Sequence, residues 1–139
     1  ESDMGFFLHQ VGGGPGNGVY SIEPNTNHSL FRHYLNRSDK WPLKKIILDM
    51  VPASAILTAD DGDGVNYTTV HPDQLLTNLE YATAMARLLY WTKPEPIPAE
   101  DDILALGNYW DKHYNGNPNV GTAEEFKLSF EQWLRRWAQ

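Results

Sequence analysis

The sequence predicts a mainly α-helical protein with a small amount of β structure, and three observations lead to this class. Several stretches place apolar residues three or four positions apart, which is the spacing of one helix face. Clusters of proline, glycine and asparagine separate these stretches, and one short apolar run follows a glycine-rich segment. We therefore expect about five helices and one small β-hairpin near residues 16–23, in a single domain of residues 1–139.

The expected helices follow one another along the chain with clear breaks between them. They cover about residues 27–37, 42–50, 72–89, 100–114 and 122–137. The last helix begins with Thr122 and Glu125, which have the spacing of a capping box. Its apolar face consists of Phe126, Phe130, Trp133 and Trp137. Residues 58–72 are rich in turn formers, so we expect an exposed loop there.

Composition argues against several classes of function. The net charge of -7 repels phosphate backbones, so a general nucleic-acid-binding protein is not expected. No apolar run approaches the roughly 20 residues of a membrane-spanning helix, so no membrane span is expected. Because the chain has no cysteine, no thiolate can serve as a nucleophile or as a zinc ligand.

The sequence implies neither a metal site nor an organic cofactor. Asp60, Asp61 and Asp63 suggest calcium, but the EF-hand register fails because Asn66 takes the place of its glycine. The five histidines do not form the closely spaced pair that is typical of a zinc-binding helix. A solvated turn is therefore the expected structure for the aspartates.

Five glycines lie between Gly12 and Gly18, and they do not form a phosphate-binding loop. A P-loop needs a lysine after its last glycine, whereas Val19 follows Gly18 here. The dinucleotide-binding pattern Gly-x-Gly-x-x-Gly is also absent in every frame. Read alone, the segment predicts a flexible hairpin turn.

The residues around this segment resemble the goose-type lysozymes and lytic transglycosylases. In that superfamily a Glu-Ser pair closes a helix, and Glu1-Ser2 is similar to it. Gly5 is similar to the small residue that follows, and Gly16-Asn17-Gly18 is similar to the glycine-rich turn. Val19–Glu23 then takes the place of the short strand that forms the floor of the glycan-binding cleft.

Two later stretches resemble further motifs of the same superfamily, in the same order. Asn78–Ala82 is similar to the helix motif Asn-Ile-x-x-Gly/Ala. His113–Gly116 is similar to Ala-Tyr-Asn-x-Gly, whose tyrosine points at the catalytic acid. The resemblance implies a lysozyme-like α+β fold that lacks the helix preceding Glu1. The chain also resembles, less specifically, the lysozyme-like proteins of tailed phages.

The resemblance implies a catalytic and a substrate-binding set. Glu1 would be the general acid, and Glu23 is the candidate for a second catalytic group. The implied substrate-binding residues are Ser2, Gly16, Asn17, Gly18, Tyr20, Asn78, Tyr114 and Asn115. Gly14 and Asn25 stand where goose-type enzymes carry aspartates, and Glu23 replaces the usual glutamine. If Glu23 faces the cleft, inverting hydrolysis is possible; if it points away, a single-acid mechanism is favoured, and our prediction is the single acid.

The implied activity is cleavage of the β-1,4 bond between N-acetylmuramic acid and N-acetylglucosamine. Peptidoglycan glycan strands would be the partner, other virion proteins are further candidate partners, and the expected location is a virion or the bacterial cell envelope. The alternative is a catalytically inactive virion or structural module that keeps the lysozyme fold and binds glycan. The altered strand residues favour this alternative, whereas Glu1-Ser2 and Tyr114-Asn115 favour the enzyme.

Overall fold

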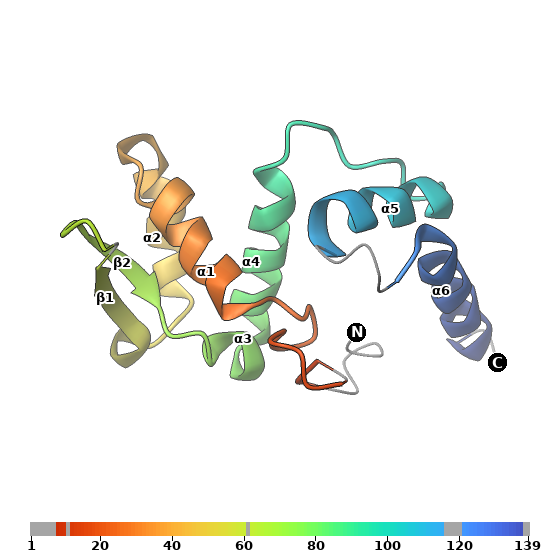
Figure 1. The fold of residues 1–139 in the computed structure, drawn as a ribbon, viewed down its shortest axis with the longest axis horizontal. Coiled ribbons are helices and arrows are strands. Elements are labelled where there is room, and N and C mark those ends of the chain that lie inside the picture. Colours follow the sequence, from red (N-terminus) through yellow and green to blue (C-terminus); the bar gives the residue numbers. More distant parts are fainter. Residues whose placement is uncertain (1–7, 11, 61, 116–120, 138–139) are drawn as a thin grey trace. The chain divides into compact units, whose positions relative to one another are not determined.

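The computed structural model describes residues 8–10, 12–60, 62–115 and 121–137. In this part of the chain the structure is mainly helical and contains one two-stranded antiparallel sheet, as Figure 1 shows. The predicted fold class, mainly α with a small β-hairpin, is therefore confirmed. Contacts between residues divide the chain into two compact units, Glu1–Leu89 and Tyr90–Gln139. Each unit is described by itself.

The first unit places its sheet between two groups of helices along the chain. Its elements are α1 (Pro24–Leu30), the π-helix η1 (Phe31–Leu35), the 3-10 helix η2 (Ser38–Lys40), α2 (Trp41–Asp49), the 3-10 helix η3 (Ala53–Ala55), β1 (Ile56–Asp60), β2 (Asn66–Val70), α3 (Gln74–Thr77) and α4 (Leu79–Trp91), whose last two residues fall in the second unit. Pro24 opens α1, where its missing N–H costs nothing. The largest fully buried apolar side chains are Tyr81, Phe31, Leu35, Leu75, Met85 and Val70.

The hairpin lies elsewhere than the sequence predicted. Strands β1 and β2 occupy most of the segment expected to be a loop, and Ile56 pairs with Val70 in the antiparallel register. The threonines, Tyr67 and Val70 have high strand propensity, and this outweighs the nearby turn formers. The turn itself uses the glycines, with the N–H of Gly62 donating to Asp60 Oδ1 at 2.6 Å. Residues 16–23 form only isolated bridges, from Asn17 to His9 and to Ile22.

The expected helix over residues 72–89 is broken in two at Asn78. Asn78 has an extended backbone (φ -123°, ψ 96°) that ends α3, and α4 begins at Leu79. Its side-chain Oδ1 accepts a hydrogen bond from the N–H of Tyr81 at 3.0 Å, which is the geometry of a helix N-cap. The long apolar periodicity correctly predicted helix here, but it could not show the change of direction.

The second unit consists of α5 (Ile103–Trp110), the π-helix η4 (Asp111–Asn115) and α6 (Ala123–Trp137). Asp102 caps α5, since its Oδ1 accepts from the N–H of Ala105 at 2.9 Å. The predicted capping box of α6 is confirmed. The N–H of Glu125 donates to Thr122 Oγ1 at 3.2 Å, and the N–H of Thr122 donates to Glu125 Oε2 at 2.9 Å.

Helices α5 and α6 pack closely because one of them presents a glycine at the contact. A Cβ on Gly107 would lie 2.8 Å from the carbonyl oxygen of Ala123, so only glycine allows this approach. The rings of Trp110 and Phe126 continue the contact, with centroids 5.6 Å apart. Within the described residues, no helix is long and apolar enough to cross a membrane.

Candidate functional site

The predicted site residues fall into three groups. Glu1 and Ser2 lie outside the described residues. Gly16–Gly18, Tyr20, Glu23 and Asn78 lie in the first unit, whereas Tyr114 and Asn115 lie in the second. The local geometry of each described group shows what its side chains can do.

The glycine-rich segment forms a tight, hydrogen-bonded turn. Asn17 and Ile22 exchange both backbone hydrogen bonds at 3.0 Å, which closes the turn between them. On the other side, the N–H of Gly18 donates to the carbonyl of Leu8 at 2.8 Å. Ser21 takes a left-handed backbone conformation (φ 48°), which a non-glycine residue adopts at a cost. These hydrogen bonds define a closed turn over residues 17–22.

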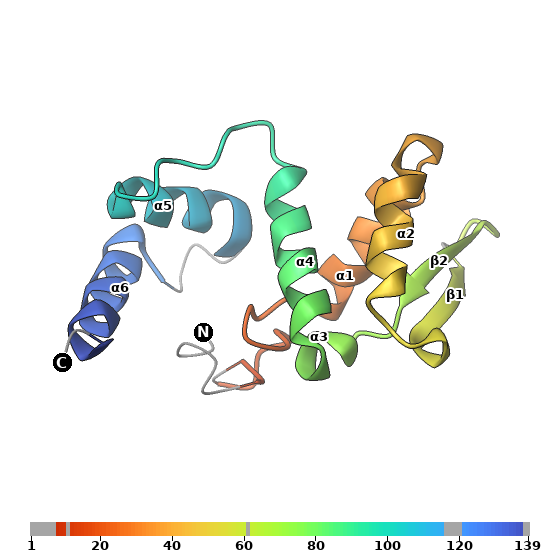
Figure 2. The same ribbon diagram turned by 180° about the vertical axis from the view of Figure 1, so that it is seen from behind.

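This turn packs against α3 and α4, beside which it lies in both views (Figures 1 and 2). Gly18 has φ 71°, and a Cβ there would come within 1.9 Å of the carbonyl oxygen of Leu75 in α3. Tyr20 reaches further, and its hydroxyl lies 3.1 Å from Thr83 Oγ1 in α4. The absence of a side chain at Gly18 thus allows the turn to sit directly on the helix backbone.

Glu23 does not belong to a strand, so the predicted strand Val19–Glu23 is wrong. Residues 18–21 form the turn, and Glu23 is the N-cap residue of α1. Within the described part of the chain, the Glu23 side chain makes no capping hydrogen bond, and the residue is exposed. Its carboxylate is therefore placed at the surface of the first unit.

Asn78 has a structural role in the first unit. Besides capping α4, its Nδ2 donates to the carbonyl of Met50 at 2.8 Å, which ties the end of α2 to the α3–α4 junction.

Comparison of the chain with protein-family models, curated proteins and solved structures found no match.

Tyr114 and Asn115 lie in η4, a π-helical turn that continues α5. The ring of Tyr114 stacks on Tyr90, with centroids 5.2 Å apart and planes at 27°. Asn115 Nδ2 donates to Asp111 Oδ1 at 2.9 Å and to the carbonyl of Gly121 at 3.2 Å. Both side chains thus take part in the internal packing of the second unit.

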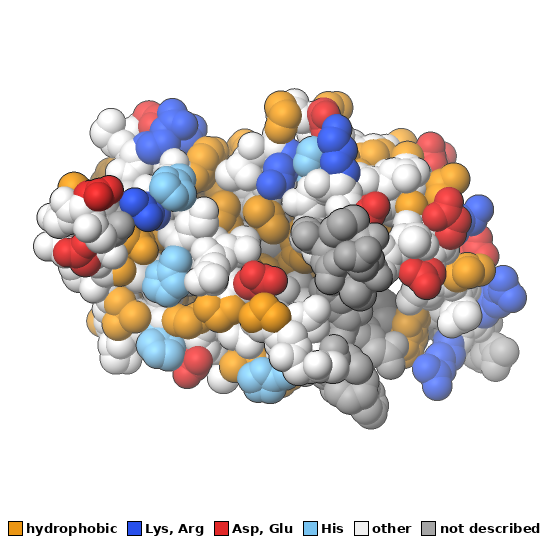
Figure 3. Space-filling view, viewed as in Figure 1, with side chains coloured by type: hydrophobic (Ala, Val, Ile, Leu, Met, Phe, Trp, Pro, Cys, Tyr) orange, Lys and Arg blue, Asp and Glu red, His pale blue; other side chains and the backbone are white. Residues whose placement is uncertain are grey.

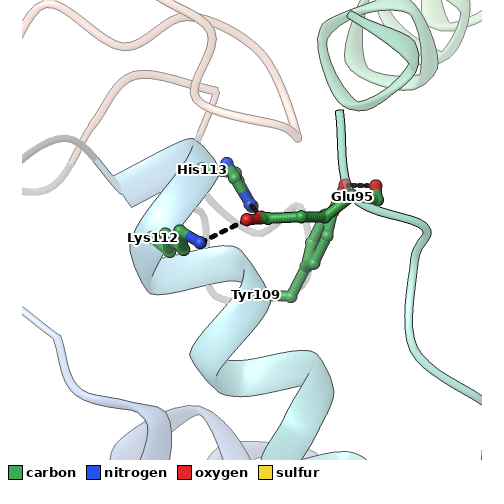
Figure 4. Close-up of polar contacts among 4 residues, drawn as sticks. All are labelled: Glu95, Tyr109, Lys112 and His113. Carbon is green, nitrogen blue, oxygen red and sulfur yellow. Dashed lines mark hydrogen bonds and ion pairs between the residues drawn. The ribbon is translucent and has the colours of Figure 1, made fainter. Parts of the chain in front are cut away.

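A polar cluster that the sequence did not predict lies beside them (Figure 4). Glu95 Oε1 accepts a hydrogen bond from Lys112 Nζ at 2.6 Å, and Glu95 Oε2 lies within hydrogen-bond distance of His113 Nε2. The Tyr109 hydroxyl donates to the backbone carbonyl of Glu95 at 2.9 Å, and its ring lies 4.5 Å from that of His113. Glu95 belongs to the proline-rich run KPEPIP, and no short motif links that run to residues 17 and 18 positions away.

The cluster is suited to holding the proline-rich segment and not to donating a proton. Hydrogen bonds from Lys112 and then from His113 lower the pKa of the Glu95 carboxyl below its ordinary value of 4.5. A general acid near neutral pH needs a raised pKa instead. Glu95 therefore stays ionised and joins residues before α5 to the turn after it.

We expect the charge of Lys112 to control the titration of Glu95. In Lys112→Gln, the Glu95 pKa should rise toward its ordinary value, because the largest cause of its lowering is removed. Carboxyl-carbon NMR titration of both proteins measures this shift. Lys127→Gln, which removes a lysine paired instead with Glu131, is the matched control. An unchanged Glu95 midpoint in Lys112→Gln would contradict the assigned contact.

Proposed function

We propose that this chain cleaves the β-1,4 bond between N-acetylmuramic acid and N-acetylglucosamine in peptidoglycan, with Glu1 as the general acid. The order of the three motifs, from Glu1-Ser2 to Tyr114-Asn115, supports this proposal. The structural observation that carries it is the fixed glycine turn. Contacts of Gly18 with Leu75 and of Tyr20 with Thr83 hold the segment that follows the proposed acid against two helices.

The proposed reaction needs one carboxyl group. Glu1 gives its proton to the leaving glycosidic oxygen as the bond from that oxygen to C1 breaks. The sugar's own C6 hydroxyl then forms the new bond to C1 and returns its proton to the Glu1 carboxylate, which leaves a 1,6-anhydro product. An inverting hydrolase instead needs a second carboxylate about 6.5–9.5 Å from the acid to activate water. Under this proposal Glu23, which is exposed at the start of α1, is not that second group.

The first test is the rate of peptidoglycan solubilisation by Glu1→Gln. Glutamine keeps the size of the side chain but cannot donate the proton, so we expect the rate to fall at least about 100-fold. Glu23→Gln is the matched control, and it should leave the rate nearly unchanged. Equal clearing by wild type and Glu1→Gln would remove Glu1 from the mechanism.

The second test is the identity of the product. Mass spectrometry of the released fragments should find 1,6-anhydro ends, whose mass is lower by one water than that of hydrolysed ends. The single-acid mechanism would be wrong if the wild type released only reducing ends and Glu23→Gln released no fragments. That result would show that Glu23 activates water.

A catalytically inactive glycan-binding module is the second candidate function. The observation that favours it is Asn78, whose amide bonds to Met50 and Tyr81 within the fold and so needs no substrate to explain its presence. Wild-type protein that co-sediments with peptidoglycan but releases no fragments would support this candidate against the enzyme.

The proposed location follows from the proposed substrate. An overall charge of -7 does not favour free electrostatic capture by an anionic cell wall. We infer that the chain acts as part of a larger assembly, in a virion or in the bacterial cell envelope, which delivers it to its substrate.

A further inference from the structure

The positive charges of this acidic protein are concentrated at the start of α2. Four of the eleven Lys and Arg residues lie between residues 37 and 45, together with one acid, Asp39. This stretch therefore carries 4 - 1 = +3, whereas the remaining seven basic and seventeen acidic residues give 7 - 17 = -10. We call this region, with Tyr34 and Trp41, the α2 basic surface. On the face drawn in Figure 3, one group of Lys and Arg side chains lies at the upper left, and further groups lie at the upper centre and at the right.

Two acids neutralise this surface only in part. Lys45 Nζ pairs with Asp49 Oδ2 at 2.5 Å, so residues 37–49, with Asp49 included, still carry 4 - 2 = +2. Asp39 accepts hydrogen bonds from Arg37 at 3.1 and 3.2 Å and forms an ion pair with Lys40 at 3.2 Å, so two cations share one carboxylate. The Arg37 side chain remains 57% exposed. Lys44 is buried and donates to Asn36 Oδ1 at 2.6 Å, so it adds positive potential beneath the surface instead of a direct contact.

Two aromatic rings lie among these cations. Trp41 is 59% exposed, and Lys44 Nζ lies 5.9 Å from its ring centroid. Lys40 Nζ lies 5.1 Å from the ring of Tyr34. The cations thus hold positions over the rings, while most of the Trp41 indole is left open to a ligand.

We propose that the α2 basic surface binds a phosphate-bearing polyol or sugar polymer of the bacterial wall. This inference rests on the proposed function, because the proposed function places the protein at the bacterial wall that carries such polymers. A phosphodiester chain matches the excess positive charge and the guanidinium of Arg37, and the exposed face of Trp41 can cover a polyol or sugar unit between phosphates. The -10 charge on the rest of the chain repels the same polymer, so contact is confined to this surface.

A membrane surface fits these residues less well. An interfacial helix needs one continuous apolar face beside its basic residues. On α2 the two most exposed apolar side chains, Trp41 and Ile46, are five positions apart, which places them on nearly opposite sides of the helix. Insertion of one would therefore leave the other in water.

The test measures binding of the full chain to purified poly(glycerol phosphate) by isothermal titration calorimetry at low salt. We expect Arg37→Gln/Lys40→Gln to weaken binding about five- to tenfold, because the ionic contacts of exposed Arg37 and of partly buried Lys40 are lost. Trp41→Ala should weaken it as well. The control is Arg135→Gln/Arg136→Gln, which removes the same charge from exposed residues of α6. Circular dichroism verifies that all variants keep their helix content.

Several outcomes would overturn the inference. They are the absence of binding by wild type, an equal loss in the Arg135/Arg136 control, and equal affinity for double-stranded DNA or for vesicles of anionic lipid. The cleavage assay uses peptidoglycan stripped of phosphate polymers, so it tests the proposed function separately. Arg37→Gln/Lys40→Gln should cleave that substrate at the wild-type rate, and loss of cleavage there would contradict the assignment to the polymer.

Discussion

Gly18→Ala is expected to destabilise the first unit by about 2–6 kcal/mol. The left-handed backbone at Gly18 (φ 71°) disfavours any side chain, which costs roughly 1–3 kcal/mol. The added Cβ would also lie 1.9 Å from the carbonyl oxygen of Leu75, and forcing the two apart costs about another 1–3 kcal/mol. Urea unfolding monitored by circular dichroism measures the change in free energy of unfolding.

Gly12→Ala separates the two costs at Gly18. Gly12 has a similar backbone (φ 86°), but nothing lies within 4 Å of the position that its Cβ would take. It should therefore show the conformational cost alone, and the difference between the variants gives the steric cost. Equal destabilisation by Gly12→Ala and Gly18→Ala would show that the turn does not sit on α3 as described.

Cleavage activity should follow the same order as stability. If the turn positions the segment after Glu1, Gly18→Ala should lower the cleavage rate even at temperatures where the first unit stays folded. Gly12→Ala should leave the cleavage rate nearly unchanged.

The helices were predictable because their signals are local. The periodicity of residues 42–50 and the capping box at Thr122 each need only a few neighbours along the chain, and α2 and α6 appear where these patterns indicate. The hairpin was misplaced for the opposite reason. The turn formers in residues 60–66 predicted a loop, although strand-forming residues lie on both sides of them. The pairing of Ile56 with Val70 is a non-local contact, which a local pattern cannot show.

The candidate site was predictable only in part. The glycine turn could be found because Gly16-Asn17-Gly18 forms a short motif, but its packing against Leu75 depends on a contact across more than fifty residues. No sequence motif predicted the Glu95 cluster, since a single Glu among prolines does not indicate a contact with Lys112. The hydrogen bond from Asn78 to Met50, the residue after α2, likewise joins positions far apart in the sequence.

Asn27→Leu is expected to destabilise the first unit by about 2–6 kcal/mol. Asn27 is completely buried, and its Nδ2 donates to the carbonyl of Val70 at 2.9 Å. Its Oδ1 accepts a hydrogen bond from the hydroxyl of Tyr81, which is also completely buried. Leucine has a similar volume but can replace neither bond, so two buried polar groups lose a partner at roughly 1–3 kcal/mol each. Urea unfolding again measures the effect.

Tyr81→Phe supplies the other half of a double-mutant cycle. Alone it leaves Asn27 Oδ1 without the hydroxyl donor, at a cost of about 1–3 kcal/mol. In Asn27→Leu/Tyr81→Phe both members of that hydrogen bond are apolar, so the combined loss should be smaller than the sum of the single losses. Simple additivity would show that the two side chains do not interact in the folded protein.

The same hydroxyl makes stability depend on alkaline pH. Burial raises the pKa of Tyr81 well above its ordinary value of 10.0. A raised folded pKa means that the hydroxyl stabilises the fold fully below the unfolded pKa, and that this stabilisation is lost as pH rises above it. Phenylalanine cannot ionise, so Tyr81→Phe should lose less stability than wild type between about pH 9 and pH 11. An equal loss in both proteins would assign the alkaline transition to other groups and contradict burial of the Tyr81 hydroxyl against Asn27.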